Sequence, residues 1–425
     1  MGKGLIRAVS AMLSAAMLMG VCACSDGSCK EYVLSDSTTD LMAGVKASSK
    51  ALAFKSDESK RQEFEKAYNA FAFKLFRECT ANDSKENTLV SPLSVMTALA
   101  MTQNGADGNT LEQMSGTLGM NKDELNQYLG AYLSNLPSSE KSKFFSANSI
   151  WLRKNSLRFN DEFLQTNADY FDADIFESKF DDKTLADINQ WVSDNTGGMI
   201  PKILDEVPDA AVMYLINALS FDAEWKKIYG KDQLYDDEFT DTEGQTQKVT
   251  MMCGTESGYL DDGMAQGFVK PYASGYSFVA MLPNEGVTLE NYIKKMKPSV
   301  IIKQIRKEEQ EPVIAAIPKF SADYSAELSG VLSAMGMNDP FNPDQADFSG
   351  MADVNKGDLY ISRVIHKTAI QVDERGTKAG AATLVEMLRN GGTMNIVYLK
   401  RPFVYMIIDN QSCLPVFIGQ VTHIG

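Results

Sequence analysis

Histidine is almost absent from this chain, which contains only His366 and His423 among its 425 residues. A hydrolase of the Ser-His-Asp type needs a histidine placed against a nucleophile. The sequence has no GxSxG, HExxH or glycine-rich phosphate-binding pattern to support such a site or a metal centre. We therefore interpret His366 as a structural core residue and expect neither an enzyme nor a bound metal or cofactor.

Cysteine and basic residues are also scarce. Three of the six cysteines lie near the N-terminus, which leaves Cys79, Cys253 and Cys413, too few and too scattered for a disulfide framework or a zinc site. The 41 Lys and Arg are outnumbered by 56 Asp and Glu, and no basic block interrupts that excess. An acidic chain of this kind argues against nucleic acid as a partner. The hydrophobic content of 44% is ample for a fold held by its core.

The first residues are typical of an exported protein. A basic start precedes an apolar run from Ala8 to Met19, which predicts a signal peptide over residues 1–23. The run closes with Val21-Cys22-Ala23-Cys24, which resembles a bacterial lipoprotein box with Cys24 as the acylated residue. Cys22 is disfavoured because the residue before it is not small. We expect lipid anchoring to the cell envelope, at the outer membrane or cell surface, with plain secretion as the alternative.

Behind the signal, composition divides the chain in two. Residues 24–59 are rich in Ser, Asp and Lys without sustained periodicity, which predicts a flexible tether. Residues 60–425 show no repeat and no further shift in composition, so we expect one large domain. Within it, Phe64, Phe71 and Leu75 recur at helical spacing and predict an amphipathic helix over about 59–80.

The rest of the domain mixes helical and strand patterns. Residues 87–94 predict a short strand that runs into a buried helix, with Ser91 as its cap and Pro92 at its first position. Helical periodicity dominates the first half of the chain, and the second half is richer in strand-like runs. These patterns predict an α+β architecture. The strand-like runs are Val212–Phe221, Phe268–Leu282, Val313–Phe320, Asn395–Asp409 and Leu414–Gln420.

Several motifs in one fixed order resemble a known family. The run Asn87–Met114 looks like the opening signature of the serpins, and further matches follow in the family's order between about residue 60 and the C-terminus. No single match would suffice, but the ordered set is specific. The further matches are Ser149–Leu152, Ile188–Val192 with Thr196-Gly197, Asn217–Phe221 with Trp225, Val249–Met252, Ile317–Phe320, Leu332–Met337, Asp347–Gly350, His366-Lys367, Arg401–Phe403 and Pro415–Gly419.

The resemblance implies a fold and an activity. The fold would have about nine helices around three β-sheets, with an exposed reactive-centre loop. The activity would be inhibition of serine proteases. In this family the reactive loop inserts into a sheet, which is a known example of strand addition. The protease cleaves the loop, and the severed loop inserts into the largest sheet while the protease remains attached as a covalent acyl complex. We expect a monomer that is a protease inhibitor and not an enzyme.

The hinge of such a loop would begin at Glu374. Every second residue from Thr377 to Thr383 is small and uncharged, and this row fits the inside of a sheet because burying an unpaired charge costs several kcal/mol. We expect the segment after Glu374 to rest in an exposed, metastable form. Arg375, Lys378 and Gly380 depart from the family pattern, and Lys378 and Gly380 fall on the outward-facing row. The hinge residues are Glu374, Gly376, Thr377, Ala379, Ala381, Ala382 and Thr383.

Two further sets of residues match positions that let the family's sheet open. A buried polar cluster beneath the sheet, called the shutter, corresponds to Ser91, Ser94, Asn217 and His366. Hydroxyl, amide and imidazole groups can exchange partners there as strands part. Trp225 matches the residue where the loop first enters the sheet, beside Glu374.

The cleaved bond is not fixed by the sequence. Counting forward from Glu374 by the family's spacing places the cut after Asn390, whereas counting back from Pro402 gives Gly391. The candidates are Leu388, Arg389, Asn390 and Gly391. Arg389 would suit a trypsin-like protease and is favoured, while Leu388 would suit a chymotrypsin-like or elastase-like pocket.

A second function from another class stays open. A serpin fold does not by itself fix function, and the departures at Arg375 and Lys378 are compatible with a non-inhibitory, cell-surface binding protein. The two hypotheses differ in one property. Cleavage of the loop should greatly raise the melting temperature only if the loop inserts.

Overall fold

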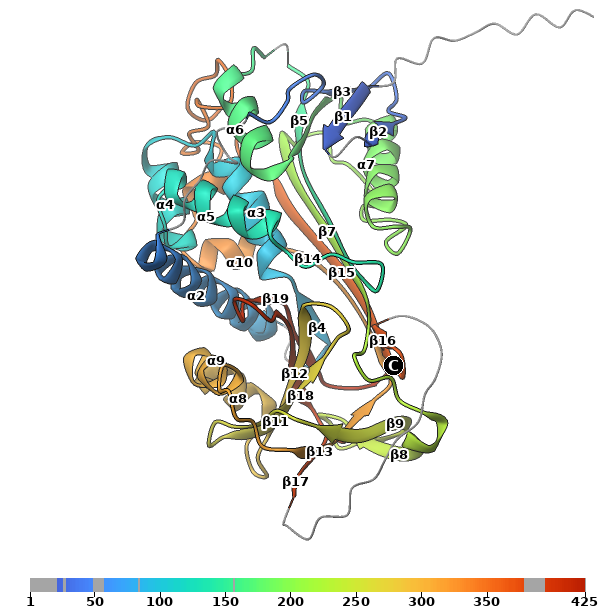
Figure 1. The fold of residues 1–425 in the computed structure, drawn as a ribbon. Helices are drawn as coiled ribbons and strands as arrows, with labels where there is room; N and C mark the ends of the chain where they lie inside the picture. Colours follow the sequence, from blue (N-terminus) through green and yellow to red (C-terminus); the bar gives the residue numbers. More distant parts are fainter. Residues whose placement is uncertain are drawn as a thin grey trace, which may run out of the picture.

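The computed structural model describes residues 21–25, 28–48, 57–82, 85–155, 157–377 and 394–424. Among them it has nine α-helices, three large β-sheets and one hairpin, which confirms the expected α+β class (Figure 1). The hairpin joins β1 (Val21–Ser25) to β2 (Ser28–Tyr32) and places Cys24 opposite Cys29. None of the described helices is long and apolar enough to cross a membrane.

The largest sheet runs through the middle of the molecule (Figure 1). From Arg363 to Ala369 its strand β15 pairs in parallel register with β7, and further along a two-residue strand lies between them. The sheet therefore has a seam at which strands already separate. Its seven strands, in spatial order, are β14 (Phe320–Glu327), β15 (Arg363–Asp373), β16 (Gly376–Thr377), β7 (Met213–Glu224), β5 (Ser142–Arg153), β6 (Asp174–Ser178) and β3 (Thr38–Asp40).

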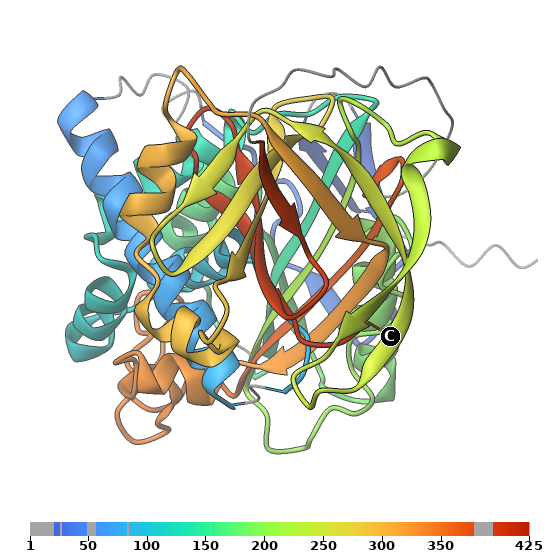
Figure 2. The same cartoon turned by 90° about the horizontal axis from the view of Figure 1, so that it is seen from below.

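Two smaller sheets pack at one end of the molecule. Seen from that end, strands occupy one side and helices the other (Figure 2). The six-stranded sheet has the order β10 (Tyr259–Asp261), β11 (Ala265–Pro271), β12 (Tyr276–Pro283), β18 (Phe403–Asp409), β19 (Pro415–Val421) and β4 (Thr88–Val90). The four-stranded sheet has the order β17 (Asn395–Tyr398), β13 (Val313–Pro318), β9 (Thr246–Glu256) and β8 (Leu234–Thr240).

Two of the helices follow the sequence closely. The predicted amphipathic helix is α2 (Glu58–Asn82), and the predicted strand and buried helix are β4 and α3 (Pro92–Gln103), with Ser91 as N-cap and every residue of α3 buried. The other helices are α4 (Gly108–Leu118), α5 (Lys122–Ser134), α6 (Asp161–Phe171), α7 (Asp182–Asn195), α8 (Leu289–Lys295), α9 (Pro298–Ile305) and α10 (Ser329–Ala334), with 3-10 turns at Lys231–Gln233 and Asp339–Phe341.

The core has two parts because helices cover both faces of the large sheet. Helix α3 and its neighbours pack on one face, and α7 packs on the other (Figure 1). Under α7, Trp191 packs on Trp151 and Phe176, whose ring centroids are 4.3 Å apart. The sheet is thus held on both faces, and its seam between β15 and β7 runs between the two cores.

The structure differs from the expected tether before α2. Strand β3 pairs with β6 and extends the edge of the large sheet. The buried Asp187 of α7 accepts hydrogen bonds from the Ser35 backbone N–H at 3.0 Å, from the Ser35 hydroxyl at 2.7 Å and from the Thr38 hydroxyl. Further on, Ser48 donates to Asp169. Residues 35–48 therefore lie on the folded domain rather than forming a free linker.

Removal of the Asp187 carboxylate should release this edge strand. Three hydrogen bonds to one buried carboxylate contribute on the order of 3 kcal/mol to holding residues 35–38. We expect Asp187→Ala to speed hydrogen exchange of the Thr38–Asp40 amides by about a hundredfold. Asp182→Ala, an exposed carboxylate on the same helix, should leave that exchange unchanged. Equal exchange in the two variants would show that Asp187 does not hold the strand.

Candidate functional site

The start of the predicted hinge already lies inside the large sheet. Strand β16 pairs antiparallel with β15 on one side and with β7 on the other. Thr377 is fully buried, and its hydroxyl is 2.9 Å from the hydroxyl of Tyr272. Gly376 has φ +152°, and a Cβ there would lie 1.9 Å from the carbonyl oxygen of Ala223. Only glycine fits at the point where the chain enters between the strands.

Two aromatic residues hold the turn that precedes β16, and we call Trp225 and Tyr229 the hinge clasp. The Trp225 backbone N–H donates to the Arg375 carbonyl at 2.8 Å, and its indole N–H donates to the Asp373 carbonyl at 2.9 Å. The Tyr229 backbone N–H donates to the Glu374 carbonyl at 2.9 Å. Three consecutive carbonyl groups are therefore fixed, so the chain enters the sheet at a set angle.

A partly exposed ion pair adds to the clasp. Lys319 Nζ lies 2.6 Å from Glu374 Oε2, and each side chain is about one third exposed. The hydrogen bond from Lys319 lowers the pKa of Glu374 below its ordinary value. The clasp residue Trp225 also stacks on Tyr272, with ring centroids 4.4 Å apart, and its two N–H bonds place it against the turn that contains Glu374.

The hinge differs from the expectation in one respect. The segment after Glu374 was expected to rest outside the sheet, but Gly376 and Thr377 are buried within it. Their insertion depends on the separation of β15 from β7, which the local sequence does not encode. The other hinge residues and the candidate bond lie outside the described residues, namely Ala379, Ala381, Ala382, Thr383, Leu388, Arg389, Asn390 and Gly391.

The four predicted shutter residues come together beyond the end of β16, where β15 and β7 are still directly paired. His366 of β15 lies in register with Asn217 of β7, and its Nδ1 contacts the Asn217 Oδ1. The Ser91 backbone N–H donates to His366 Nε2 at 3.1 Å, so Nδ1 carries the ring proton. Asn217 donates its amide to the Ser94 hydroxyl. The cluster therefore bridges the two strands that must part for the hinge to insert further.

Sequence reasoning missed one member of the cluster. Asn148 of β5 lies in register with Asn217, and its Oδ1 accepts from the Ser94 hydroxyl at 2.6 Å. Its position directly before the Ser149–Leu152 motif was the only available signal. With Asn148 in place, Ser94 has a partner on β5, a strand that does not border the seam between β15 and β7.

Burial sets the charge state of the shutter. His366 is fully enclosed, and this lowers its pKa from 6.5 to about 3. The folded protein keeps the ring neutral, so as pH falls only the unfolded chain binds that proton. His366 therefore reduces stability as pH drops below about 6.5, and this effect ends near the folded-state pKa of about 3.

A pair of histidine variants tests this. Between about pH 7.5 and about pH 5, titration of His366 should remove about 2 kcal/mol from the free energy of unfolding. We expect His366→Gln to abolish that part of the pH dependence in urea unfolding, and His423→Gln, which changes the only other histidine, to retain it. An unaltered pH slope in His366→Gln would mean that the ring is not held neutral.

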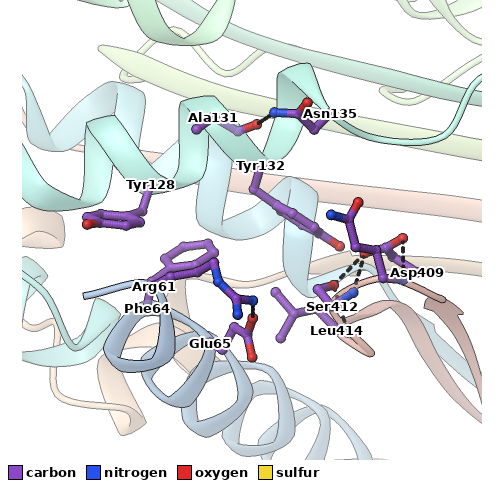
Figure 3. A pocket seen from close by; sticks show the side chains of 11 residues that line it. Arg61, Phe64, Glu65, Tyr128, Ala131, Tyr132, Asn135, Asp409, Ser412 and Leu414 are labelled. Carbon is purple, nitrogen blue, oxygen red and sulfur yellow. Dashed lines mark hydrogen bonds and ion pairs between the residues drawn. The ribbon is translucent and has the colours of Figure 1, made fainter. Parts of the chain in front are cut away.

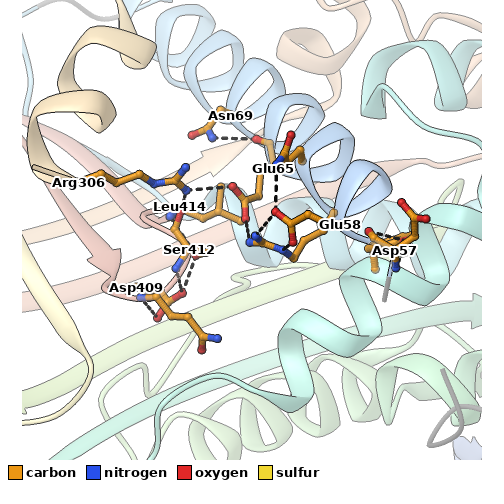
Figure 4. A network of polar contacts seen from close by, with 12 residues as sticks. Asp57, Glu58, Glu65, Asn69, Arg306, Asp409, Ser412 and Leu414 are labelled. Carbon is orange, nitrogen blue, oxygen red and sulfur yellow. Dashed lines mark hydrogen bonds and ion pairs between the residues drawn. The ribbon is translucent and has the colours of Figure 1, made fainter. Parts of the chain in front are cut away.

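A cavity of about 290 Å³ lies apart from the hinge, between α2, α5 and the turn that joins β18 to β19 (Figure 3). Its aromatic wall includes Phe64, Tyr128 and Tyr132. Beside it, Glu65 binds both Arg61 and Arg306, and Arg306 also donates to the Ser412 carbonyl (Figure 4). Because these charges already bind one another, the network ties α2 to the end of α9 and to the β18–β19 turn.

Among the described residues, no three His, Cys, Asp or Glu side chains are grouped in a way that could bind a metal ion. The features that do come together are a large sheet with a seam between β15 and β7, and the short strand β16 inserted at one end of that seam. The hinge clasp holds the turn before β16, and the polar shutter lies where β15 and β7 are still paired. A family model for serpins, described as serine protease inhibitors, matches residues 66–424. The chain belongs to the serpin family.

Known relatives are similar along most of their length. The chain is 31% identical over 371 residues to a serpin-like protein of Thermococcus kodakarensis, covering 84% of each chain. It is 30% identical over 365 residues to the plasma serine protease inhibitor of Bos taurus, covering 83% of this chain and 89% of the relative. The native-state structure of Tengpin, a thermophilic serpin, shares 45% identity at a TM-score of 0.84 and covers 91% of this chain and 100% of its own. Family members of this kind are inhibitors rather than enzymes.

Proposed function

We propose that this protein inhibits serine proteases as a suicide substrate, by cleavage of its reactive loop and insertion of the cut loop into the large sheet. The observation that carries the proposal is β16. Gly376 and Thr377 occupy the first positions of a strand antiparallel to both β15 and β7. Each further residue that follows Thr377 into the sheet extends a strand that has already begun, so insertion needs no new nucleus.

The mechanism follows from that geometry. A target protease attacks a loop carbonyl, the peptide bond breaks, the new amino terminus leaves, and an acyl ester joins the protease to the loop. The freed segment then extends β16 between β15 and β7. About fifteen residues at about 3.3 Å each would carry the protease roughly 50 Å. Displacement of its catalytic groups by even about 1 Å can cost a hundredfold in rate, so the acyl ester persists.

Insertion of the loop must break the direct pairing between β15 and β7. Direct pairing of β15 with β7 extends over the seven register pairs from Arg363–Tyr214 to Ala369–Ser220. The contact between His366 and Asn217 lies within this stretch. After separation, His366 still accepts from Ser91, and Ser94 still has Asn148. His366 and Ser94 therefore each keep a hydrogen-bond partner when the shutter opens, and this keeps the barrier to insertion low.

A denaturing gel tests the proposed function. The protein is mixed with trypsin-like, chymotrypsin-like and elastase-like enzymes, and we expect a covalent band with at least one of them, at the summed mass less that of the released C-terminal fragment. Catalytically blocked protease serves as the control and should give no such band. Clean cleavage without a covalent band for all three classes would contradict inhibition and would favour a non-inhibitory surface binding protein.

The target is proposed to be trypsin-like, with chymotrypsin-like or elastase-like enzymes as alternatives. Arg389 supports this choice, because its cation suits a specificity pocket that holds a carboxylate. The mass of the small fragment released on reaction locates the bond among Leu388, Arg389, Asn390 and Gly391. We further propose that the protein acts as a monomer and without a cofactor.

The membrane anchor remains a separate proposal. The support is the sequence at Cys24, whose acylation would attach the domain to the cell envelope. We expect Cys24→Ala to move the protein from the membrane fraction to the soluble exported fraction. Cys22→Ala is the matched control and should remain with the membrane. Retention of Cys24→Ala in the membrane would refute lipidation at that residue.

A further inference from the structure

A buried ion pair lies behind the hinge clasp and plays no part in the mechanism above. Lys270 of β11 and Glu256 of β9 join the six-stranded sheet to the four-stranded sheet. The Lys270 Nζ is 2.7 Å from Glu256 Oε1, and the two side chains are only 1% and 7% exposed. Loss of either partner would leave the other charge buried without compensation, which is strongly destabilising at that point.

On the lysine side, the pair supports the clasp. The Lys270 ammonium lies 5.1 Å from the Trp225 ring centroid and 4.1 Å from the Tyr229 ring centroid, and it donates to the Lys227 carbonyl at 3.3 Å. A cation at these distances is attracted to an aromatic face, more so where water is excluded. Lys270 therefore fixes the segment whose N–H groups hold Asp373, Glu374 and Arg375. This is the N-terminal anchor of the reactive loop.

On the glutamate side, the pair reaches the other end of the loop. Glu256 lies in register with Val313 of β13, and Val313 lies in register with Asn395, the first residue of β17. Strand β17 is the C-terminal anchor of the loop, and it pairs with β13 over only four residues at the edge of its sheet. One ion pair thus stands between the clasp at one end of the loop and a short edge strand at the other.

The two anchors matter differently for a cut and an uncut loop. Seventeen residues, from Lys378 to Met394, separate β16 from β17. Inserting about fifteen of them would move their far end roughly 50 Å along the sheet, and the remainder is too short to return to β17. An uncut loop can therefore insert fully only if β17 leaves β13. A cut loop inserts with β17 in place, because the chain is already broken between them.

We propose that the Lys270–Glu256 pair couples the two anchors of the reactive loop and thereby opposes insertion of the uncut loop. Lys270 and Glu256 are positioning residues, acting through the clasp and through β9–β13–β17. Neutralising either partner leaves the other charge buried without compensation, and this loosens both anchors together. The cut loop, which does not need β17 to leave, is little affected. The consequence for inhibition rests on the proposed function, whereas the coupling itself is a property of the uncut protein.

Hydrogen exchange of the full-length, uncut protein, in the absence of protease, tests the coupling. We expect Glu256→Gln, which keeps the shape of the side chain, to speed exchange by about tenfold both at Asp373–Thr377 and at Asn395–Tyr398. Lys270→Met should do the same. Glu65→Gln is the matched control, because it removes another partly buried carboxylate that binds cations, far from the loop, and should change neither segment.

A merely structural role would accelerate exchange around Glu256 and Lys270 without moving the two anchors together. Faster exchange at only one anchor in both variants, or at neither, would overturn the proposal. If Lys270→Met fails to fold, the comparison of Glu256→Gln with Glu65→Gln decides it. On incubation without protease, Glu256→Gln should also lose its susceptibility to cleavage. This loss should proceed about tenfold faster than in the parent protein. If the parent forms no covalent complex, the proposed function fails, but the exchange result still decides the coupling.

Discussion

We expect Thr377→Arg to turn the proposed inhibitor into a substrate that proteases cleave and release. Thr377 is fully enclosed between β15 and β7, and its hydroxyl meets that of Tyr272. A guanidinium at this position must be buried without a partner or keep β16 out of the sheet, at a cost of several kcal/mol. Because each 1.4 kcal/mol on the barrier slows a step about tenfold, we expect insertion to slow by about a hundredfold or more.

The stoichiometry of inhibition measures this effect. Slower insertion lets deacylation win, so many molecules of Thr377→Arg should be cleaved for each protease that is trapped. Thr377→Val keeps the volume and loses only the hydroxyl contact with Tyr272, and it should remain an inhibitor. A covalent complex formed by Thr377→Arg at the parent's yield would show that β16 is not the start of the inserting strand.

Arg389→Ala should reduce the association rate with trypsin-like proteases by about a hundredfold or more. A cation bound to the carboxylate of such a protease pocket forms a charge pair removed from water, and truncating one partner of such a pair typically costs about 2–5 kcal/mol. The rate with a chymotrypsin-like enzyme should change little if that enzyme uses Leu388. Residual protease activity, measured at timed intervals after mixing, gives both association rates.

Lys378→Ala is the control for charge, since it removes a cation from the same loop nearer the hinge. It should leave both rates within a few-fold of the parent. An unchanged trypsin rate in Arg389→Ala would move the cleaved bond to another candidate. The fragment mass would then show whether the protease cuts beside Leu388, Asn390 or Gly391.

Much of the fold was predictable because apolar spacing determines it. Helix α2, strand β4 and helix α3 follow from periodicity and from the Ser91-Pro92 start, and the strand-rich second half follows from its apolar runs. Strand β3 gave no such signal. Its residues are polar, and Asp187, about 150 positions away, holds the segment by hydrogen bonds. Contacts at that separation leave no local pattern in the chain.

The site was predictable in its side chains but not in its backbone. Alternation of small residues placed Thr377 on the inner face, and the family pattern brought Ser91, Ser94, Asn217 and His366 together. The early insertion of Gly376 and Thr377 depends on where two distant strands separate. The clasp binds carbonyl groups, which every residue carries. The sequence therefore indicates which residues suit the sheet, and the tertiary structure determines how far they have entered.

The pair formed by Lys270 and Glu256 shows the same limit. In the sequence each is a single charge within a strand pattern, and nothing marks the two as partners. Only the junction of two sheets brings them together behind Trp225 and Tyr229. Buried charges of this kind become apparent only when strands from different sheets are seen side by side.

The melting temperature of the protein after a single cut in the reactive loop, compared with that of the intact protein, tests the central claim most directly. If β16 is the beginning of a strand that grows between β15 and β7, the cut protein gains a full central strand and should melt at least about 10 °C higher. Equal melting temperatures, with the cut segment still open to further proteolysis, would contradict insertion and with it the inhibitory mechanism.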